Sequence, residues 1–130
     1  MTLSVALVTP EREIWSGTAR RLIAKTLDGD IGILTGHAPV FGVLAPGSLV
    51  RILDAEGNEA RAAVSAGFLS VSDDQVSVLA QQAQLGDEVD VQALESELNS
   101  LVGESGPPGD EEQARIAYAQ ALLRAAGQSG

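Results

Sequence analysis

The residues of this chain that could do chemistry are few, and the most distinctive of them fall in one stretch. Residues 32–39 read Gly-Ile-Leu-Thr-Gly-His-Ala-Pro and contain His37, the only histidine. The stretch holds no catalytic nucleophile, no pair of metal ligands and no phosphate-binding glycine pattern. We therefore interpret it as a shaped loop on a β-scaffold, and as a docking surface rather than an active site.

Acidic pairs are the other residues that could act chemically, as general acids and bases. Asp73-Asp74 and Asp87-Glu88 lie in predicted surface turns without an apolar pocket, so solvated side chains explain them better. The chain has no cysteine, which excludes a disulfide framework, a thiolate metal site and a cysteine nucleophile. With a single histidine as well, we expect no catalytic residues, no metal site and no cofactor.

Length and composition limit the class of protein. A chain of 130 residues with 45% hydrophobic residues forms one ordinary domain, or a compact domain with a small appendage. Aromatic residues make up only 3%, which argues against surfaces that stack on bases. The formal net charge of −10 disfavours contact with a phosphate backbone, so we expect no nucleic-acid partner.

No targeting segment is expected at the start of the chain. Residues 1–10 show neither a basic region nor a small-residue cleavage site. Their apolar run is too short to cross a bilayer. We predict a cytoplasmic protein that meets a membrane only through a partner.

Alternating apolar and polar side chains predict a series of strands without intervening helices. Asp28-Gly29 is a hairpin signal, and Gly17 indicates a bulge or bend at residues 15–17. Strands that recur every eight to twelve residues are typical of a sandwich or barrel, and we predict a β-sandwich of two antiparallel sheets with about ten strands. The expected strands span residues 3–8, 14–27, 31–34, 41–44, 48–53, 59–65, 68–72 and 76–80.

The composition changes near Gln81, where residues 81–90 are polar and acidic and are interpreted as a linker. Apolar residues then recur at helical spacing over residues 91–102, with Asp90 as the N-cap and Gly103 at the C-terminal cap. Residues 103–109 cannot continue a helix, and Asp110 with Gln113 resembles a capping box for a second helix over 111–126. We predict a β-domain over residues 1–85 and an antiparallel two-helix hairpin over 86–130.

The second helix carries apolar residues on two sides, so it requires two partners. We expect its alanine-rich side, formed by Ala114, Ala117, Tyr118, Ala121 and Ala125, to pack against the first helix. Ile116 and Leu123 lie on nearly the opposite side and are the expected docking residues of the hairpin. Because short helices are marginally stable alone, we expect a mobile hairpin with conditional docking.

One family resemblance covers most of the chain. Residues 29–34, Gly-Asp-Ile-Gly-Ile-Leu, followed by Gly36, His37, Ala38 and Pro39, resemble the signature of the ε subunits of bacterial F-type ATP synthases. Residues 14–17, 44–47, 67–71 and 76–80 resemble other family segments, and the resemblance weakens after Gln84. Thr35 stands where the family usually has proline.

The resemblance implies a non-catalytic subunit on the central rotor stalk, at the cytoplasmic face of the bacterial cell membrane. Its implied partners are the γ subunit and the ring of c subunits, and conditionally the catalytic α and β subunits. Asp30 is the implied contact with the c-ring, and the loop of Gly36, His37, Ala38 and Pro39 is expected at the same end of the sandwich. The hairpin is implied to restrain ATP hydrolysis when it extends along γ.

Some members of that family bind ATP through an Ile-Asp-x-x-Arg-Ala motif at the start of the second helix. The matching positions here are Gly109, Asp110, Gln113 and Ala114, so glutamine replaces the arginine. Gln120 replaces a second basic residue, and Arg115 is expected on another face of the helix. A triphosphate would lose its charge partners, and we expect no ATP binding.

Simpler interpretations stand beside these. His37 can serve only to shape a turn, Asp28 and Asp30 can be solvated turn residues, and the glycines can be structural. The alternative function is a free-standing β-sandwich that binds a small ligand, or a jelly-roll enzyme. Such enzymes gather several histidines and carboxylates, so a single histidine argues against this alternative.

Overall fold

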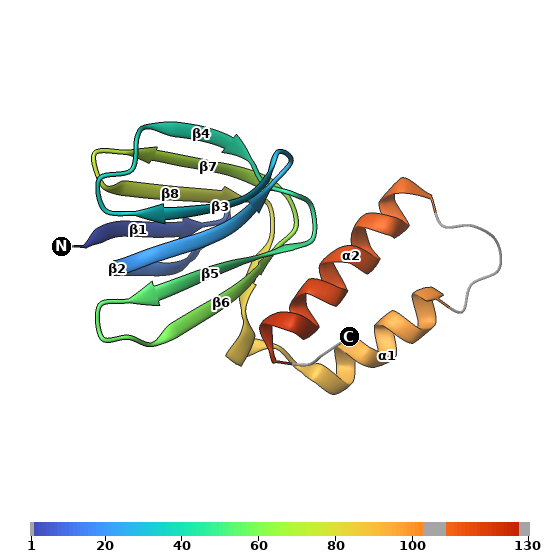
Figure 1. Cartoon of the computed structure of the whole chain (residues 1–130). Helices are drawn as coiled ribbons and strands as arrows, with labels where there is room; N and C mark the ends of the chain where they lie inside the picture. The colour runs from blue at the N-terminus through green and yellow to red at the C-terminus, as the bar shows by residue number, and fades with distance from the viewer. Residues whose placement is uncertain (1, 103–108, 128–130) are drawn as a thin grey trace.

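The computed structural model describes residues 2–102 and 109–127 of the chain, and Figure 1 shows a body of strands with two helices at one end. The described residues form nine strands, one short 3-10 helix and two α-helices. Their bounds are β1 (Leu3–Val8), β2 (Glu13–Thr26), β3 (Gly29–Leu34), β4 (Val40–Val43), β5 (Ser48–Asp54), β6 (Glu59–Val64), β7 (Gly67–Ser72), β8 (Gln75–Ala80), β9 (Ala83–Leu85), η1 (Gly86–Glu88), α1 (Val91–Val102) and α2 (Asp110–Ala125).

The alternation of side chains explains where the strands form and which face they bury. In β1, Leu3, Val5 and Leu7 are buried, and in β8 the same holds for Val76 and Val78. Their neighbours in sequence point outward, because successive side chains of a strand lie on opposite faces. The eight predicted strands are confirmed, and their inward residues form one apolar core.

The long strand β2 joins the two layers of the sandwich. Residues 13–19 pair with β1, which continues through β8 and β7 to β4. Residues 21–26 pair with β3 on one side, and residues 19–24 with β5 on the other, followed by β6 and β9. The pairing register shifts between Ala19 and Arg21, where the strand passes from one layer to the other. The predicted fold, a β-sandwich followed by two helices, is confirmed.

Two details of the sheets differ from the prediction. The pairing of β1 with β8 is parallel, although every other pairing between named strands is antiparallel in the described residues. The pairing of β1 with β2 is irregular near the start of β2: Leu7 pairs with Trp15 and Val8 with Glu13, so Ile14 has no partner in β1. This irregularity lies one position before the bulge predicted at residues 15–17. The hairpin signal holds, because β2 and β3 are joined by the two residues Leu27 and Asp28.

The segment interpreted as a linker is partly ordered structure, and this prediction was wrong. Residues 83–85 form β9, which pairs with β6, and residues 86–88 form the 3-10 helix η1. A three-residue strand among polar neighbours has too short a pattern to be recognised by alternation. The described sandwich therefore extends three residues beyond Gln82 before the helices begin.

The helices begin where helix signals place them, with one exception. The Asp90 carboxylate accepts a hydrogen bond from the Ala93 amide at 3.1 Å, which confirms Asp90 as the N-cap of α1. Helix α2 starts at Asp110 with Gly109 as its N-cap and no side-chain capping bond, so the predicted capping box was wrong. Gly103 and the turn after it lie outside the described residues. Neither described helix is long and apolar enough to span a membrane.

Helix α2 lies between α1 and the sandwich, as Figure 1 shows, and so has the two partners that its two apolar sides require. Its contacts with the sandwich are mainly with β6 and β5. Ala119, Ala121, Leu122, Leu123 and Ala125 are buried in a second apolar cluster, together with Ala63 of β6 and Leu94 of α1. The hairpin is thus docked in this structure.

The alanine side of α2 meets the sandwich, which differs from the expectation that it packs against the first helix. A side chain on Gly47, in the turn before β5, would collide with Ala117, so the alanine side of α2 faces the sandwich. Ile116 is half-buried and Leu123 is buried, and helical spacing puts both on the side opposite the middle of the alanine side. Helical spacing predicted that two partners were needed, but it contains no information on which partner meets which side.

Candidate functional site

The loop of residues 35–39 is closed by local hydrogen bonds. The Gly36 amide donates to the Asp74 carboxylate at 2.7 Å, and the His37 amide donates to the Leu34 carbonyl at 3.1 Å. His37 Nδ1 lies 2.7 Å from the carbonyl oxygen of Ala38. Gly36 has a φ of +85°, which favours glycine. This arrangement fits a shaped turn.

The structure separates Asp30 from this loop. Asp30 is the second residue of β3 and pairs with Lys25, whereas the loop begins after Leu34 at the other end of the same strand. The four positions from Asp30 to Leu34 span about 13 Å of extended strand before the loop begins. The expectation that Asp30 and Gly36, His37, Ala38 and Pro39 lie at the same end of the sandwich was therefore wrong.

Asp30 lies at the end of the sandwich that carries the helices. It lines a hollow of about 390 Å³ together with Lys25, Gly47, Arg51 and Arg124. Arg124, in the last turn of α2, reaches the Gly47 carbonyl at 3.4 Å. Asp30 itself is exposed, so its carboxylate is open to a partner from solvent.

An exposed apolar surface covers the opposite layer, and the sequence reasoning missed it. Val43, Phe68, Leu79 and Val8 are register partners across β4, β7, β8 and β1, and all four are on the outer face. Phe41 stacks on Phe68 with ring centroids 5.4 Å apart, and 67% of Phe41 is exposed. We call these five residues the apolar row. A hollow of about 400 Å³ is lined by three residues of the row, Phe68, Leu79 and Val8.

The signal for the apolar row was present in the sequence. In residues 40–43 and 67–71, apolar side chains occupy both odd and even positions. Successive side chains of a strand point to opposite faces, so some of these apolar side chains must point away from the core. Soluble monomers rarely leave such a contiguous surface uncovered without an interaction to make. The row is therefore a candidate protein-binding surface.

Arg51 and Glu59 form an ion pair on the outer face of the sandwich. Arg51 donates to both carboxylate oxygens of Glu59, at 3.2 and 3.0 Å, and these hydrogen bonds hold the pKa of Glu59 below its usual range. In residues 2–102 and 109–127, no three histidine or carboxylate side chains are placed to share a metal ion. The jelly-roll alternative thus lacks the ligand cluster that would favour it in the described part of the chain.

The degenerate ATP motif borders a cleft between the helices and the sandwich. Ala114 and Arg115 both line this cleft of about 570 Å³. Tyr118, whose pKa is raised by burial, and Leu94 of α1 complete the apolar part of the wall. Glu97 also lines the cleft, and its negative charge offsets the attraction of Arg115 for an anion.

Comparisons with known proteins agree on one family. A family model described as "ATP synthase, Delta/Epsilon chain, beta-sandwich domain" matches residues 2–86. The chain is 52% identical over 127 residues to the ATP synthase epsilon chain of Thermobifida fusca, covering 95% of this chain and 91% of that protein. It is 42% identical over 123 residues to the epsilon chain of Rhodococcus opacus, covering 95% and 94%.

Two solved structures share the fold. One chain of the Euglena gracilis mitochondrial ATP synthase, in a structure described as OSCP/F1/c-ring, superposes with a TM-score of 0.75 at 20% identity, over 97% of this chain and 79% of that chain. One chain of the Tetrahymena thermophila mitochondrial ATP synthase, described as central stalk/c-ring, gives a TM-score of 0.62 at 17% identity, over 96% of each chain. At these identities the likeness establishes the fold.

We predict that the chain does not bind ATP at sub-millimolar concentration. One arginine in a cleft that also holds a glutamate cannot replace the charge partners that a triphosphate requires, and the net charge of −10 opposes an anion further. Calorimetric titration of the full chain with magnesium-ATP should give no saturable heat. Saturation at micromolar ATP would contradict the prediction, and the variant Arg115→Gln would then show whether the cleft is responsible.

Proposed function

The chain belongs to the family of ATP synthase epsilon chains, and on this premise we propose that it is a non-catalytic subunit of the central rotor stalk of a proton-translocating F-type ATP synthase. It links the γ subunit to the ring of c subunits and regulates ATP hydrolysis through its helical hairpin. It acts at the cytoplasmic face of the bacterial cell membrane and reaches the membrane only through the complex.

The apolar row is the observation that carries this proposal. It spans four strands on the outer face of a sandwich that is otherwise complete, and it contains two stacked aromatic rings. Aromatic side chains at the centre of an apolar patch contribute much of the binding energy in protein interfaces. The row therefore supports permanent association with another subunit, and γ is the partner that we assign to it.

The separation of Asp30 from the loop divides the remaining contacts between two partners. One flat ring cannot touch both ends of the sandwich, so we assign the ring of c subunits to the end with Asp30. The loop with Gly36, His37, Ala38 and Pro39 leads directly into β4, which carries Phe41 and Val43 of the apolar row. We therefore assign the loop to the γ interface.

The docked hairpin supports a regulatory role. Helix α2 rests on β5 and β6 through small side chains and one long arginine contact, 3.4 Å between Arg124 Nη2 and the Gly47 carbonyl. We propose that α1 and α2 leave this position, extend along γ toward the α and β subunits and restrain hydrolysis there. A switch of this kind requires two states within a few kcal/mol of each other.

Replacing Phe68 with serine should weaken binding of the chain to γ. The change removes the central ring of the apolar row and its stacking partner for Phe41, while Phe68 is 46% exposed and lies outside the core. Loss of an aromatic anchor from an interface costs about 2 kcal/mol or more, roughly a 30-fold loss of affinity. Leu27→Ser is the matched control, because Leu27 is 66% exposed and lies in the turn between β2 and β3, outside the row and away from the loop assigned to γ. Equal affinities of both variants for isolated γ would contradict the assignment.

Reversing the charge of Asp30 should reduce coupling of ATP hydrolysis to proton pumping. Asp30→Lys removes an exposed carboxylate from the end assigned to the c-ring, and exposed ion pairs contribute up to about 1 kcal/mol, so we expect partial loss. Glu56→Lys makes the same charge change at an exposed position in the turn between β5 and β6. Proton pumping per ATP hydrolysed, measured in membrane vesicles, should fall only for the Asp30 variant. Unchanged coupling would place the ring contact elsewhere.

Deleting residues 90–130 should leave a folded sandwich that still assembles with γ. The sandwich core and the helix cluster share no buried residue among those described, and Glu88 is the last residue of η1. Because the hairpin is removed, the truncated complex should hydrolyse ATP at least as fast as the intact complex. Side-by-side ATPase rates and a cooperative melting curve of the truncated chain measure both points. Slower hydrolysis would contradict a restraining role for the hairpin.

A further inference from the structure

We propose that two glycines of the sandwich side, Gly47 and Gly86, determine whether the hairpin docks, because each admits the backbone of α2 at a distance that no other residue allows. Gly86 is the decisive one. The proposal rests on the proposed function for its effect on ATP hydrolysis, but the docking contact itself is a property of this chain.

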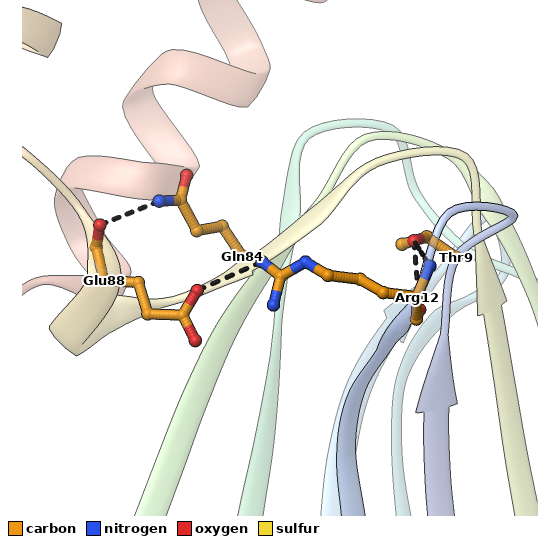
Figure 2. A network of polar contacts seen from close by, with 4 residues as sticks. All are labelled: Thr9, Arg12, Gln84 and Glu88. Atoms are coloured by element: carbon orange, nitrogen blue, oxygen red, sulfur yellow. Dashed lines mark hydrogen bonds and ion pairs between the residues drawn. The ribbon is translucent and has the colours of Figure 1, made fainter.

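Gly86 is fixed to the sandwich. It follows β9, which pairs with β6 through Leu85 and Ala62, and it precedes Glu88. Figure 2 shows how Glu88 is held: its carboxylate is 3.1 Å from Arg12 Nη2, and its carbonyl accepts a hydrogen bond from Gln84 Nε2 at 2.8 Å. Arg12 is part of the turn closed by Thr9, whose hydroxyl donates to the Arg12 carbonyl. A moving hairpin therefore pivots after Glu88.

The other side of the contact is the backbone of α2. A Cβ atom at Gly86 would lie 1.9 Å from the carbonyl oxygen of Ala125 and 2.5 Å from its carbonyl carbon. A Cβ atom at Gly47 would lie 2.6 Å from both the carbonyl carbon and the Cβ of Ala117. Backbone atoms of a helix cannot rotate aside as a long side chain can, so α2 as a whole would have to withdraw.

Close approach matters because Ala117, Ala121 and Ala125 bring only small side chains to the contact between α2 and the sandwich. Ala121 and Ala125 are buried, yet each brings one methyl group to the contact. A radial gap of 0.5–1 Å forfeits about a quarter to a half of the dispersion energy between facing atoms. Moving α2 outward to admit one methyl group therefore weakens the whole contact with β5 and β6.

The test is Gly86→Ala in the full chain, with Gly32→Ala as the matched control. Gly86 and Gly32 both have backbone angles that alanine accepts, but a Cβ atom at Gly32 meets no atom within 4 Å. We expect amide hydrogen exchange over α2 to accelerate at least tenfold in Gly86→Ala, with β1, β5 and β8 unchanged. Trp15 lines the hollow that Gly86 and Ala125 share, so its fluorescence emission should change in the same variant.

A second variant places the added volume on the helix instead. Ala117→Leu enlarges the side chain that meets Gly47 without altering the sandwich, so misfolding of the sandwich cannot explain its result. Accelerated exchange over α2 in both variants would support the proposal. Exchange equal to that of the unaltered chain in both variants would overturn it.

Hydrolysis by the assembled complex separates this proposal from the proposed function. If the released hairpin restrains catalysis, a complex with Gly86→Ala should hydrolyse ATP more slowly than the unaltered complex. Faster exchange with an unchanged rate of hydrolysis would support the glycine contacts and contradict the regulatory role. Unchanged exchange would overturn the glycine contacts whatever the rate.

Discussion

The structure depends on one strand that belongs to both layers of the sandwich. β2 pairs with β1 in one layer and with β3 and β5 in the other, and its residues Ala19, Leu22 and Ala24 are buried in the core between them. A slip of one residue in this strand would turn its buried side chains outward in both layers at once. Its register therefore fixes which loops share an end of the sandwich.

The outer faces of the two layers then acquire different roles. On one layer, Leu49 and Ala63 point outward and are covered by α2 from the same chain. On the other layer, the apolar row points outward and the described residues of the chain leave it exposed. A sandwich whose core is already filled has no structural need for apolar side chains on its outside, so both faces are explained by what docks on them. In the proposed function, one partner is internal and removable, and the other is a separate subunit.

Patterns that depend on neighbours in sequence were predicted well, and arrangements that depend on distant segments were not. Alternation located eight strands, and Asp90 marked the start of α1, because both signals are local. The parallel pairing of β1 with β8 joins segments about seventy positions apart, which no local pattern encodes. The family signature placed Asp30 and His37 at one end of the sandwich, and only the length of β3 shows that they lie at opposite ends.

The composition of α2 suits the proposed switch, in which the helix is stable in two surroundings. Its side toward the sandwich carries Ala117, Ala121 and Ala125, and a buried methyl group contributes only about 0.8 kcal/mol. Leaving the sandwich therefore exposes little apolar surface on α2, and the loss of contact stays small. Leu122 and Leu123 are buried in the cluster that includes Leu94 of α1, so the two helices keep their larger side chains together when they move as a pair. Small residues against the sandwich and large residues in the helix cluster thus favour the reversible docking that the proposed switch requires.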